Sequence, residues 1–175
     1  MLLDIKKIVL ICLLSSSLFS KSNTQIAGDV LLVTLPLAVY GTTLYIDDKE
    51  GEFQFYKTTG VTVGASYLLK YSVQEERPDK SDNHSFPSAH TSITFASSGF
   101  VHKRYGFKYA IPAYLASIYT GYSRVQSDKH YTHDVVAGAV LGLATSWYFS
   151  SSYRGVDIKP IVSNDFQGVL LSYRW

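Results

Sequence analysis

The sequence has a single cysteine, few charged residues and no internal repeat or low-complexity segment. Because Cys12 has no second cysteine to pair with, an intramolecular disulfide and a Cys/His metal framework are both excluded. Charged residues make up 17% of the 175-residue chain and the net charge is only +2, so we expect no nucleic-acid partner. The length suits one domain with its own core.

Apolar residues, by contrast, are abundant: 46% of the chain is hydrophobic, with 14 Tyr and 9 Phe. Aromatic side chains with a polar tip suit boundaries between apolar and wet regions. Lys6 and Lys7 precede an apolar stretch over 8–19 and several serines, a pattern typical of a secretory signal. We expect residues 1–20 to be a signal peptide or an uncleaved anchor helix, and both send the rest of the chain out of the cytoplasm.

Helical patterns dominate the middle of the chain, so we predict an all-α fold, a helical bundle of about five helices over 26–152. The expected helices cover 28–46, 53–72, 88–101, 108–122 and 132–150. The charged segment DDKEGE, the basic turn HKRYGFK and a polar connection at 123–131 are expected to separate helices. The spacing of Gly138, Gly142 and Ser146 predicts close approach by a neighbouring helix.

The C-terminal tail, 153–175, has a different pattern. Its apolar residues alternate at Val169, Leu171, Tyr173 and Trp175. With a turn signal at Asn164-Asp165, this alternation predicts a short β-hairpin. Alternation that ends in an aromatic residue also resembles an outer-membrane barrel strand, but one hairpin cannot close a barrel.

Membrane insertion is open at this stage. The expected helices at 28–46 and 132–150 are long and apolar enough to cross a bilayer. The third expected helix is a poor lipid-facing span because it carries Thr91, Ser92, Thr94, Ser97 and Ser98. We favour a membrane-embedded or membrane-associated bundle, with a soluble periplasmic domain as the alternative.

Three polar segments, 70–78, 86–90 and 123–134, carry the residues with chemical potential. The first follows the second expected helix, the second opens the third helix, and the third joins the last two helices. In an up-and-down bundle these positions meet at one end. The sequence therefore predicts a cluster of Lys70, Arg77, Ser88, His90, Arg124, His130 and Asp134.

This cluster has the composition of a phosphate site. Lys70, Arg77 and Arg124 bring three cations together, and a guanidinium fork pairs two oxygens of a tetrahedral anion. Ser88 at a helix start adds a hydroxyl and backbone N–H groups, which attract phosphate. Each feature alone has an ordinary explanation, such as a solvated helix end or a helix cap. Their combination in three ordered segments favours function.

Two histidines can perform the covalent and proton chemistry. His130 and Asp134 are four apart, so Asp134 can accept from one imidazole nitrogen and leave the other as the nucleophile. His90 is placed to protonate a leaving oxygen. A His–Asp pair at this spacing also occurs in structural and metal-binding roles. Three other histidines receive no role: His84, His102 and His133.

The ordered pattern K-x6-RP, P-S-x-H and S-R-x5-H-x3-D resembles that of the type 2 phosphatidic acid phosphatase family. That family shares its site with vanadium haloperoxidases and bacterial class A acid phosphatases. The resemblance covers roughly residues 55–150. It implies an all-α bundle that hydrolyses a phosphomonoester or pyrophosphate with no metal and no cofactor.

The resemblance also implies a role for each site residue. The implied phosphate-binding residues are Lys70, Arg77, Ser88, Ala89 and Arg124. His90 would be the general acid, His130 the nucleophile that forms a phosphohistidine, and Asp134 the residue that orients it. Ala89 stands where the family pattern has glycine, and its backbone N–H can still donate to phosphate.

We therefore expect a phosphatase in the cell envelope whose substrate is a phosphorylated lipid. Phosphatidic acid, phosphatidylglycerol phosphate, undecaprenyl pyrophosphate and lipid A are all open, as is the oligomeric state. A soluble periplasmic acid phosphatase is the alternative. A haloperoxidase is disfavoured because members with this site are much longer, and a non-enzymatic envelope protein because it leaves the cluster unexplained. The basic turn at 102–108 should face the cytoplasm and the site the periplasm.

Overall fold

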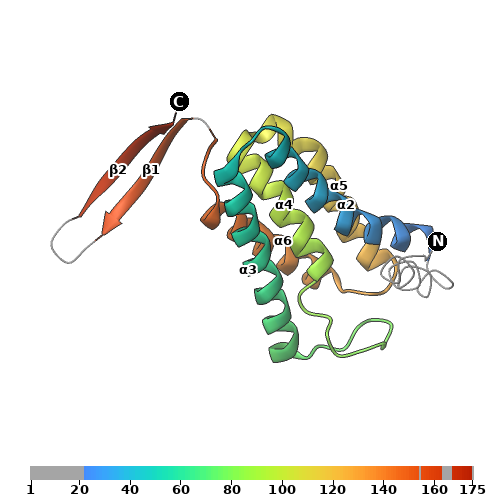
Figure 1. The fold of residues 1–175 in the computed structure, drawn as a ribbon. Coiled ribbons are helices and arrows are strands. Elements are labelled where there is room, and N and C mark those ends of the chain that lie inside the picture. The colour runs from blue at the N-terminus through green and yellow to red at the C-terminus, as the bar shows by residue number, and fades with distance from the viewer. Residues whose placement is uncertain (1–21, 154, 163–166, 175) are drawn as a thin grey trace, which may run out of the picture.

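The computed structural model describes residues 22–153, 155–162 and 167–174. Within this part of the chain, five helices form the predicted all-α bundle (Figure 1). They are α2 (Asn23–Tyr45), α3 (Lys49–Val73), α4 (Ala89–Tyr105), α5 (Phe107–Gln126) and α6 (Thr132–Phe149). Residues 1–20, predicted to be a signal peptide or anchor, lie outside the described residues.

α2 begins at Asn23, five residues before the predicted start at 28, and α3 begins at Lys49, four residues before the predicted start at 53. Asp48 caps the helix, and its carboxylate accepts a hydrogen bond of 3.0 Å from an amide of the first turn. Glu50 and Glu52 lie in that turn, where the helix dipole favours acidic side chains. The predicted charged break is therefore confined to residues 46–48.

The predicted basic turn over 102–108 is wrong. α4 runs through it to Tyr105, with basic residues 102–104 in its last turn, where the helix dipole favours cations. Gly106 alone separates α4 from α5. Its φ of 105° is a conformation that glycine adopts without the steric cost that other residues meet.

The predicted polar connection at 123–131 is also too long. α5 extends to Gln126, so Ser123 and Arg124 lie on a helix. The Ser123 hydroxyl donates to the carbonyl of Thr120 at 2.7 Å, which satisfies a polar side chain inside the helix. This places Arg124 on a rigid element instead of a loop.

α4 is the central helix and packs against the four others. Its contact with α6 follows the predicted stripe of Gly138, Gly142 and Ser146. A Cβ at Gly138 would lie 2.6 Å from the carbonyl oxygen of Ser88, so only glycine allows this approach. The close helix contact predicted from the spacing is confirmed.

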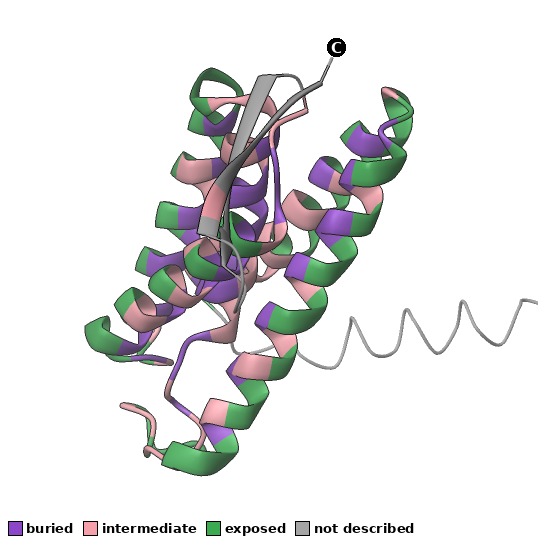
Figure 2. Cartoon of the chain, turned by 90° about the vertical axis from the view of Figure 1, so that its left-hand side faces the viewer, coloured by how far each residue is buried: buried purple, intermediate pink, exposed green. Residues whose placement is uncertain are grey.

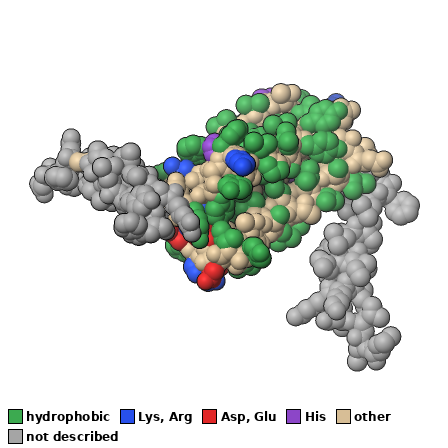
Figure 3. Space-filling view, turned by 90° about the horizontal axis from the view of Figure 1, so that it is seen from above, with side chains coloured by type: hydrophobic (Ala, Val, Ile, Leu, Met, Phe, Trp, Pro, Cys, Tyr) green, Lys and Arg blue, Asp and Glu red, His purple; other side chains and the backbone are tan. Residues whose placement is uncertain are grey.

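The bundle buries small polar side chains and exposes large apolar ones. Figure 2 shows which positions along the helices are buried, and Figure 3 shows hydrophobic side chains spread over one face of the molecule. Fully buried hydroxyl residues fill the helix interfaces: Thr58, Thr62, Ser66, Thr91, Ser92, Thr94, Ser98, Ser117, Thr120 and Ser123. Some of them bond across helices, as Ser66 and Ser92 do at 2.7 Å. The exposed apolar residues include Val30, Leu37, Leu68, Leu115, Ile118, Val140 and Trp147.

Of the described helices, α2 alone has both the length and the apolar composition of a bilayer-crossing segment, and signal sequences share these properties. The helix expected at 132–150 does not reach this level, because α6 interrupts its apolar positions with His133, Asp134, Thr145 and Ser146.

A buried ion pair closes the end of the bundle opposite the N-terminus of α4. Arg104 is only 4% exposed and donates from Nε to Asp48 Oδ2 at 2.7 Å. It also donates to the carbonyl of Ser151 at 3.1 Å, and the Tyr105 hydroxyl donates to Asp48 at 2.8 Å. Arg104 thereby ties the α2–α3 connection and the segment after α6 to the end of α4.

In the tail, β1 (Gly155–Val162) and β2 (Gln167–Arg174) pair antiparallel. The turn signal at Asn164-Asp165 and the terminal Trp175 lie outside the described residues. The predicted hairpin needs a turn between these strands, and because the residues of that turn are not described, the hairpin stays a prediction. The division of the chain into 1–20, 26–152 and 153–175 also stays a prediction.

Candidate active site

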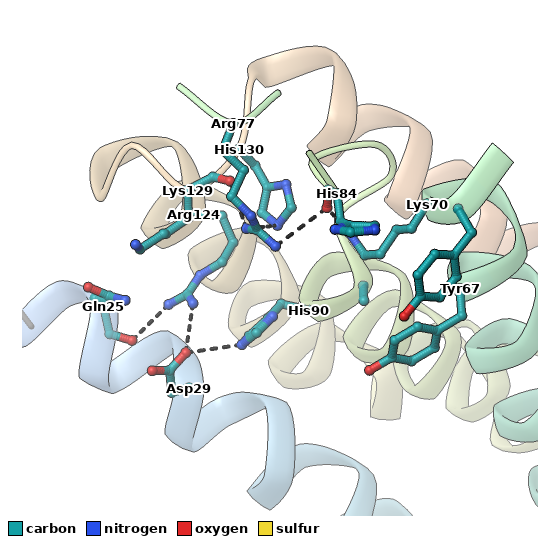
Figure 4. Close-up of a pocket in the computed structure, with 12 residues that line it drawn as sticks. Gln25, Asp29, Tyr67, Lys70, Arg77, His84, His90, Arg124, Lys129 and His130 are labelled. Carbon is teal, nitrogen blue, oxygen red and sulfur yellow. Dashed lines mark hydrogen bonds and ion pairs between the residues drawn. The ribbon is translucent and has the colours of Figure 1, made fainter. Parts of the chain in front are cut away.

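A pocket of about 310 Å³ opens at the end of the bundle where α3 ends and α4 begins (Figure 4). Six of the predicted site residues line it: Lys70, Arg77, Ala89, His90, Arg124 and His130. Asp134 and Ser88 are fully buried behind them. The three polar segments therefore meet at one end of the bundle, as the helix order predicts.

Asp134 holds His130 from behind. The Nδ1 atom of His130 lies 3.4 Å from Asp134 Oδ2. The same oxygen accepts hydrogen bonds from the backbone N–H of Tyr131 at 2.9 Å and from the Ser85 hydroxyl at 2.5 Å. These donors fix the carboxylate, and the carboxylate in turn fixes the imidazole ring.

The other imidazole nitrogen, Nε2 of His130, lies 3.3 Å from Nη1 of Arg77. A guanidinium has only donors, so Nε2 is the acceptor and its lone pair points at the cation. Burial, with Lys70 and Arg77 nearby, lowers the pKa of His130 to about 3, although Asp134 opposes this shift. His130 is therefore neutral at physiological pH and able to act as a nucleophile.

The loop after α3 fixes the two cations beside His130. Lys70 is 6% exposed, and its Nζ donates to the carbonyls of His84 at 2.7 Å and Ser85 at 3.1 Å. The Nε of Arg77 donates to Asp82 Oδ1 at 2.8 Å. The loop thus folds back over the end of α3 and places both side chains on the pocket wall.

Asp29 of α2 joins the remaining two site residues (Figure 4). Its Oδ1 accepts from Nη1 of Arg124 at 2.6 Å and lies 3.0 Å from Nε2 of His90. Arg124 also donates to the carbonyl of Gln25 at 2.7 Å. α2 approaches this closely because Gly28 lacks a Cβ, which would lie 2.5 Å from Nη2 of Arg124.

The first turn of α4 presents its backbone to the pocket. Ser88 is the N-cap, and its Oγ accepts from Thr91 Oγ1 at 3.0 Å, so its hydroxyl lies behind the wall. Ala89, the first residue of α4, lines the pocket. The first N–H groups of a helix have no carbonyl partner within it, so a bound phosphate would meet the amides of this turn.

Together these groups suit transfer of a phosphoryl group to nitrogen. Three cations face a neutral imidazole whose lone pair points at one of them, and a second histidine stands beside a carboxylate. A family model described as PAP2 superfamily matches residues 53–156, more than half of the chain. The chain belongs to the PAP2 superfamily.

Individual relatives agree with this assignment. The PAP2 chain is 31% identical over 166 residues to the lipid A 4'-phosphatase of Helicobacter pylori (strain J99), with 85% of this chain and 83% of that protein covered. It is 36% identical over 77 residues to the lipid A 1-phosphatase of Porphyromonas gingivalis, covering 42% of this chain and 17% of that protein.

A crystal structure of a transmembrane PAP2 type phosphatidylglycerolphosphate phosphatase from Bacillus subtilis is also similar. It aligns at a TM-score of 0.43 and 18% identity, covering 83% of this chain and 92% of that chain. The prediction that this PAP2 protein is a phosphoric ester hydrolase is confirmed by its family and its lipid A phosphatase relatives. The role of each site residue stays a prediction.

Sequence analysis missed two residues that this geometry brings into the PAP2 site. Asp29 lies outside the motifs, within the apolar segment 28–46, and a lone charge in such a segment is a signal that could have marked it. Ser85, whose hydroxyl holds Asp134, carries no such signal. Its role depends on a fold of the loop that spacing does not specify.

Proposed function

We propose that this PAP2 protein hydrolyses a phosphomonoester or pyrophosphate on a membrane lipid, through a phosphohistidine at His130 and without a metal ion. The observation that carries the proposal is the contact of His130 Nε2 with Arg77 at 3.3 Å. Because of this contact, the nucleophilic lone pair and a phosphate-binding cation meet at one point of the pocket.

In the first step, Nε2 of His130 attacks phosphorus, and the bond to the leaving oxygen breaks as the N–P bond forms. The three cations of the pocket stabilise the charge on the phosphoryl oxygens in the transition state. Asp134 stabilises the positive charge that develops on the imidazole through the Nδ1 proton. His90 gives its proton to the leaving oxygen.

In the second step, water attacks the phosphohistidine. His90 takes a proton from the water, the N–P bond breaks and His130 becomes neutral again. Inorganic phosphate then leaves, so the sum of both steps is ester plus water to alcohol plus phosphate. Asp29 contacts both His90 and Arg124, which suits it to hold the general acid beside the bound phosphate.

The same charges support the proposed metal independence. Lys70, Arg77 and Arg124 supply the positive charge that a divalent ion supplies in many phosphoryl-transfer sites. We expect full turnover of the purified protein in EDTA. Loss of activity on chelation, with recovery on adding Mg²⁺ or Zn²⁺, would replace this proposal with a metal-dependent phosphatase.

Three observations support a lipid substrate. The relatives from Helicobacter pylori and Porphyromonas gingivalis are, by name, lipid A phosphatases. In addition, apolar side chains face outward while hydroxyl groups fill the helix interfaces, a distribution suited to packing within lipid. The exposed aromatics Tyr67 and Tyr71 line the pocket, as expected where a site meets a membrane–water boundary. Lipid A phosphate is therefore the first substrate to test.

The test is phosphate release by the purified protein in detergent. Lipid A, phosphatidylglycerol phosphate, phosphatidic acid and undecaprenyl pyrophosphate are compared with the soluble ester p-nitrophenyl phosphate. We expect hydrolysis of a lipid, with lipid A preferred and detergent required. Preference for the soluble ester without detergent would favour a periplasmic acid phosphatase. No release from any substrate would favour a non-enzymatic envelope protein.

We further propose that the pocket faces the periplasm. Lys103 and Lys108 lie at the opposite end of the bundle, and positive residues prefer the cytoplasmic side. Arg104 does not count, because it is buried against Asp48. In a Cys12→Ser background, a cysteine at exposed Asn83 should react with a membrane-impermeant thiol reagent in intact spheroplasts, and one at Lys108 should not. The reverse pattern would place the site in the cytoplasm.

A further inference from the structure

A cluster of groups that can bind a metal ion, separate from the phosphate pocket, lies on the outer side of Asp134, away from His130. The Nε2 atom of His133 lies 2.8 Å from Glu75 Oε1 and 3.3 Å from Asp134 Oδ1. The three ligand atoms lie within 4.8 Å of one another. The proposed mechanism uses neither Glu75 nor His133.

The buried oxygen Oδ1 of Asp134 belongs to this cluster. Asp134 is 0% exposed, and its other oxygen, Oδ2, is surrounded by donors from Ser85 and Tyr131. Oδ1 has no hydrogen-bond partner within the described part of the chain. It lies 3.3 Å from Nε2 of His133, which is an ion pair only when that imidazole is protonated. Beside a neutral His133, a cation held between the two atoms would stabilise this buried carboxylate oxygen.

The geometry of His133 is set in advance for such a ligand. Its ring stacks on Tyr131 with centroids 5.3 Å apart and an interplanar angle of 8°, and on Phe86 at 6.3 Å and 29°. These two rings fix the imidazole so that Nε2 faces both carboxylates. Little side-chain ordering would therefore accompany metal binding.

We propose that Glu75, His133 and Asp134 form a binding site for Zn²⁺. Zinc takes nitrogen and carboxylate oxygen at about 2.0–2.2 Å in tetrahedral geometry, which separates neighbouring ligands by about 3.3 Å. The separation from His133 Nε2 to Asp134 Oδ1, 3.3 Å, equals this value, and the 2.8 Å separation to Glu75 Oε1 would have to widen by about 0.5 Å. Two carboxylates and one imidazole also suit zinc in charge and softness, with water in the fourth position.

Zinc at this site inhibits the phosphatase, a consequence that rests on the proposed function. A cation on Oδ1 draws electron density from the carboxylate whose Oδ2 faces Nδ1 of His130. Asp134 then stabilises the developing imidazolium less well, so formation of the phosphohistidine slows. The site therefore regulates turnover through the residue that orients the nucleophile.

Binding is measured first without substrate, by calorimetric titration of the full chain in detergent with Zn²⁺, and with Co²⁺ as a spectroscopic probe. We expect one ion per chain, with visible absorption of tetrahedral Co²⁺. His133→Gln and Glu75→Gln should each weaken binding by about tenfold to a hundredfold. His102→Gln, which removes a histidine at the far end of α4, should bind as the unaltered protein does.

Turnover is then measured over the same zinc range. We expect inhibition of the unaltered protein to follow zinc occupancy, and inhibition of both variants to require higher zinc concentrations. In EDTA, both variants should turn over as fast as the unaltered protein. No saturable binding, or inhibition that is equal in the unaltered protein and both variants, would overturn the zinc site. Loss of turnover in EDTA would instead contradict the metal independence of the proposed function, so the two failures are distinguishable.

Discussion

Asp29 Oδ1 lies 2.6 Å from Nη1 of Arg124, so a carboxylate from α2 is paired with a cation that we propose as a phosphate-binding group. The same oxygen lies 3.0 Å from His90. In the proposed mechanism, Asp29 would compete with a bound phosphate for Arg124 and would stabilise the protonated form of His90, the proposed general acid. The first effect would weaken substrate binding and the second would favour proton transfer, so the two can be separated by measuring KM and kcat.

Asp29→Asn keeps the shape of the side chain and removes its charge. We expect KM to fall, because Arg124 no longer pairs with an anion, and kcat to fall on the order of tenfold to a hundredfold, because His90 loses its counterion. Steady-state kinetics on the preferred substrate separate the two constants, and Asp29→Glu should recover part of kcat. A change in thermal stability with both constants unaltered would assign Asp29 a purely structural role.

His130→Ala should abolish turnover. The variant removes the only side chain whose lone pair is directed at Arg77 within the pocket that the structure describes. With ³²P-labelled substrate and an acid-free quench, the unaltered protein should carry label on histidine, and the variant should carry none. Asp134→Asn should retain weak labelling because the nucleophile is present but poorly oriented. Normal turnover in His130→Ala would refute the mechanism.

Acid should destabilise the protein through His130. Its pKa is about 3 in the folded chain against an ordinary 6.5, so below pH 6.5 the unfolded chain binds a proton that the folded chain does not. The resulting loss of stability is absent above pH 6.5 and reaches about 2 kcal/mol at pH 5. Thermal unfolding near pH 7.5 and pH 5 should show a smaller difference in His130→Gln. Equal differences would contradict the shift.

Vanadate should inhibit competitively, because it adopts the five-coordinate geometry of the transition state. Arg77→Lys should raise the inhibition constant by about tenfold or more, since an ammonium cannot replace the paired donors of a guanidinium. Lys80→Arg, at an exposed position of the same loop, is the matched control and should not change it. Insensitivity of the unaltered protein to vanadate would count against a phosphohistidine site.

Arg104→Ala should unfold the protein at lower temperature without slowing the molecules that remain folded. The change leaves Asp48 buried and unpaired, which costs about 3–5 kcal/mol. Lys103→Ala, one residue earlier, should cost much less, because that side chain is partly exposed. The double variant Asp48→Leu/Arg104→Met should recover part of the loss. A fall in kcat with normal stability would show that this end of the bundle communicates with the site.

The sequence predicts that the site residues converge, because the number and order of the helices already determine which helix ends lie together in an up-and-down bundle. Lys70 ends one helix and His90 opens the next, so they must share an end of the bundle whatever the packing details. Arg104 shows where this reasoning stops. A run of basic residues suggested a solvated turn, yet its partner Asp48 is 56 residues away, and nothing local marks the pair.

Asp29 and Glu75 were missed for the same physical reason. Each meets its partners through tertiary packing, Asp29 because Gly28 admits α5 and Glu75 because the loop after α3 folds back. Local patterns report helix faces and caps well, since these depend on neighbours in the chain. They do not report which surfaces meet, and the electrostatics of a site depend on those surfaces.

The glycine at 138 has a consequence beyond helix packing. Its missing side chain leaves room for the carbonyl of Ser88, whose backbone N–H donates to the carbonyl of Asp134 at 3.0 Å. The segments that carry His90 and His130, the proposed general acid and nucleophile, are thus held at a fixed separation by backbone contacts of one residue, Ser88. An added methyl at Gly138 would push the α4 and α6 backbones apart, so the distance between His90 and His130 would change although neither residue is altered.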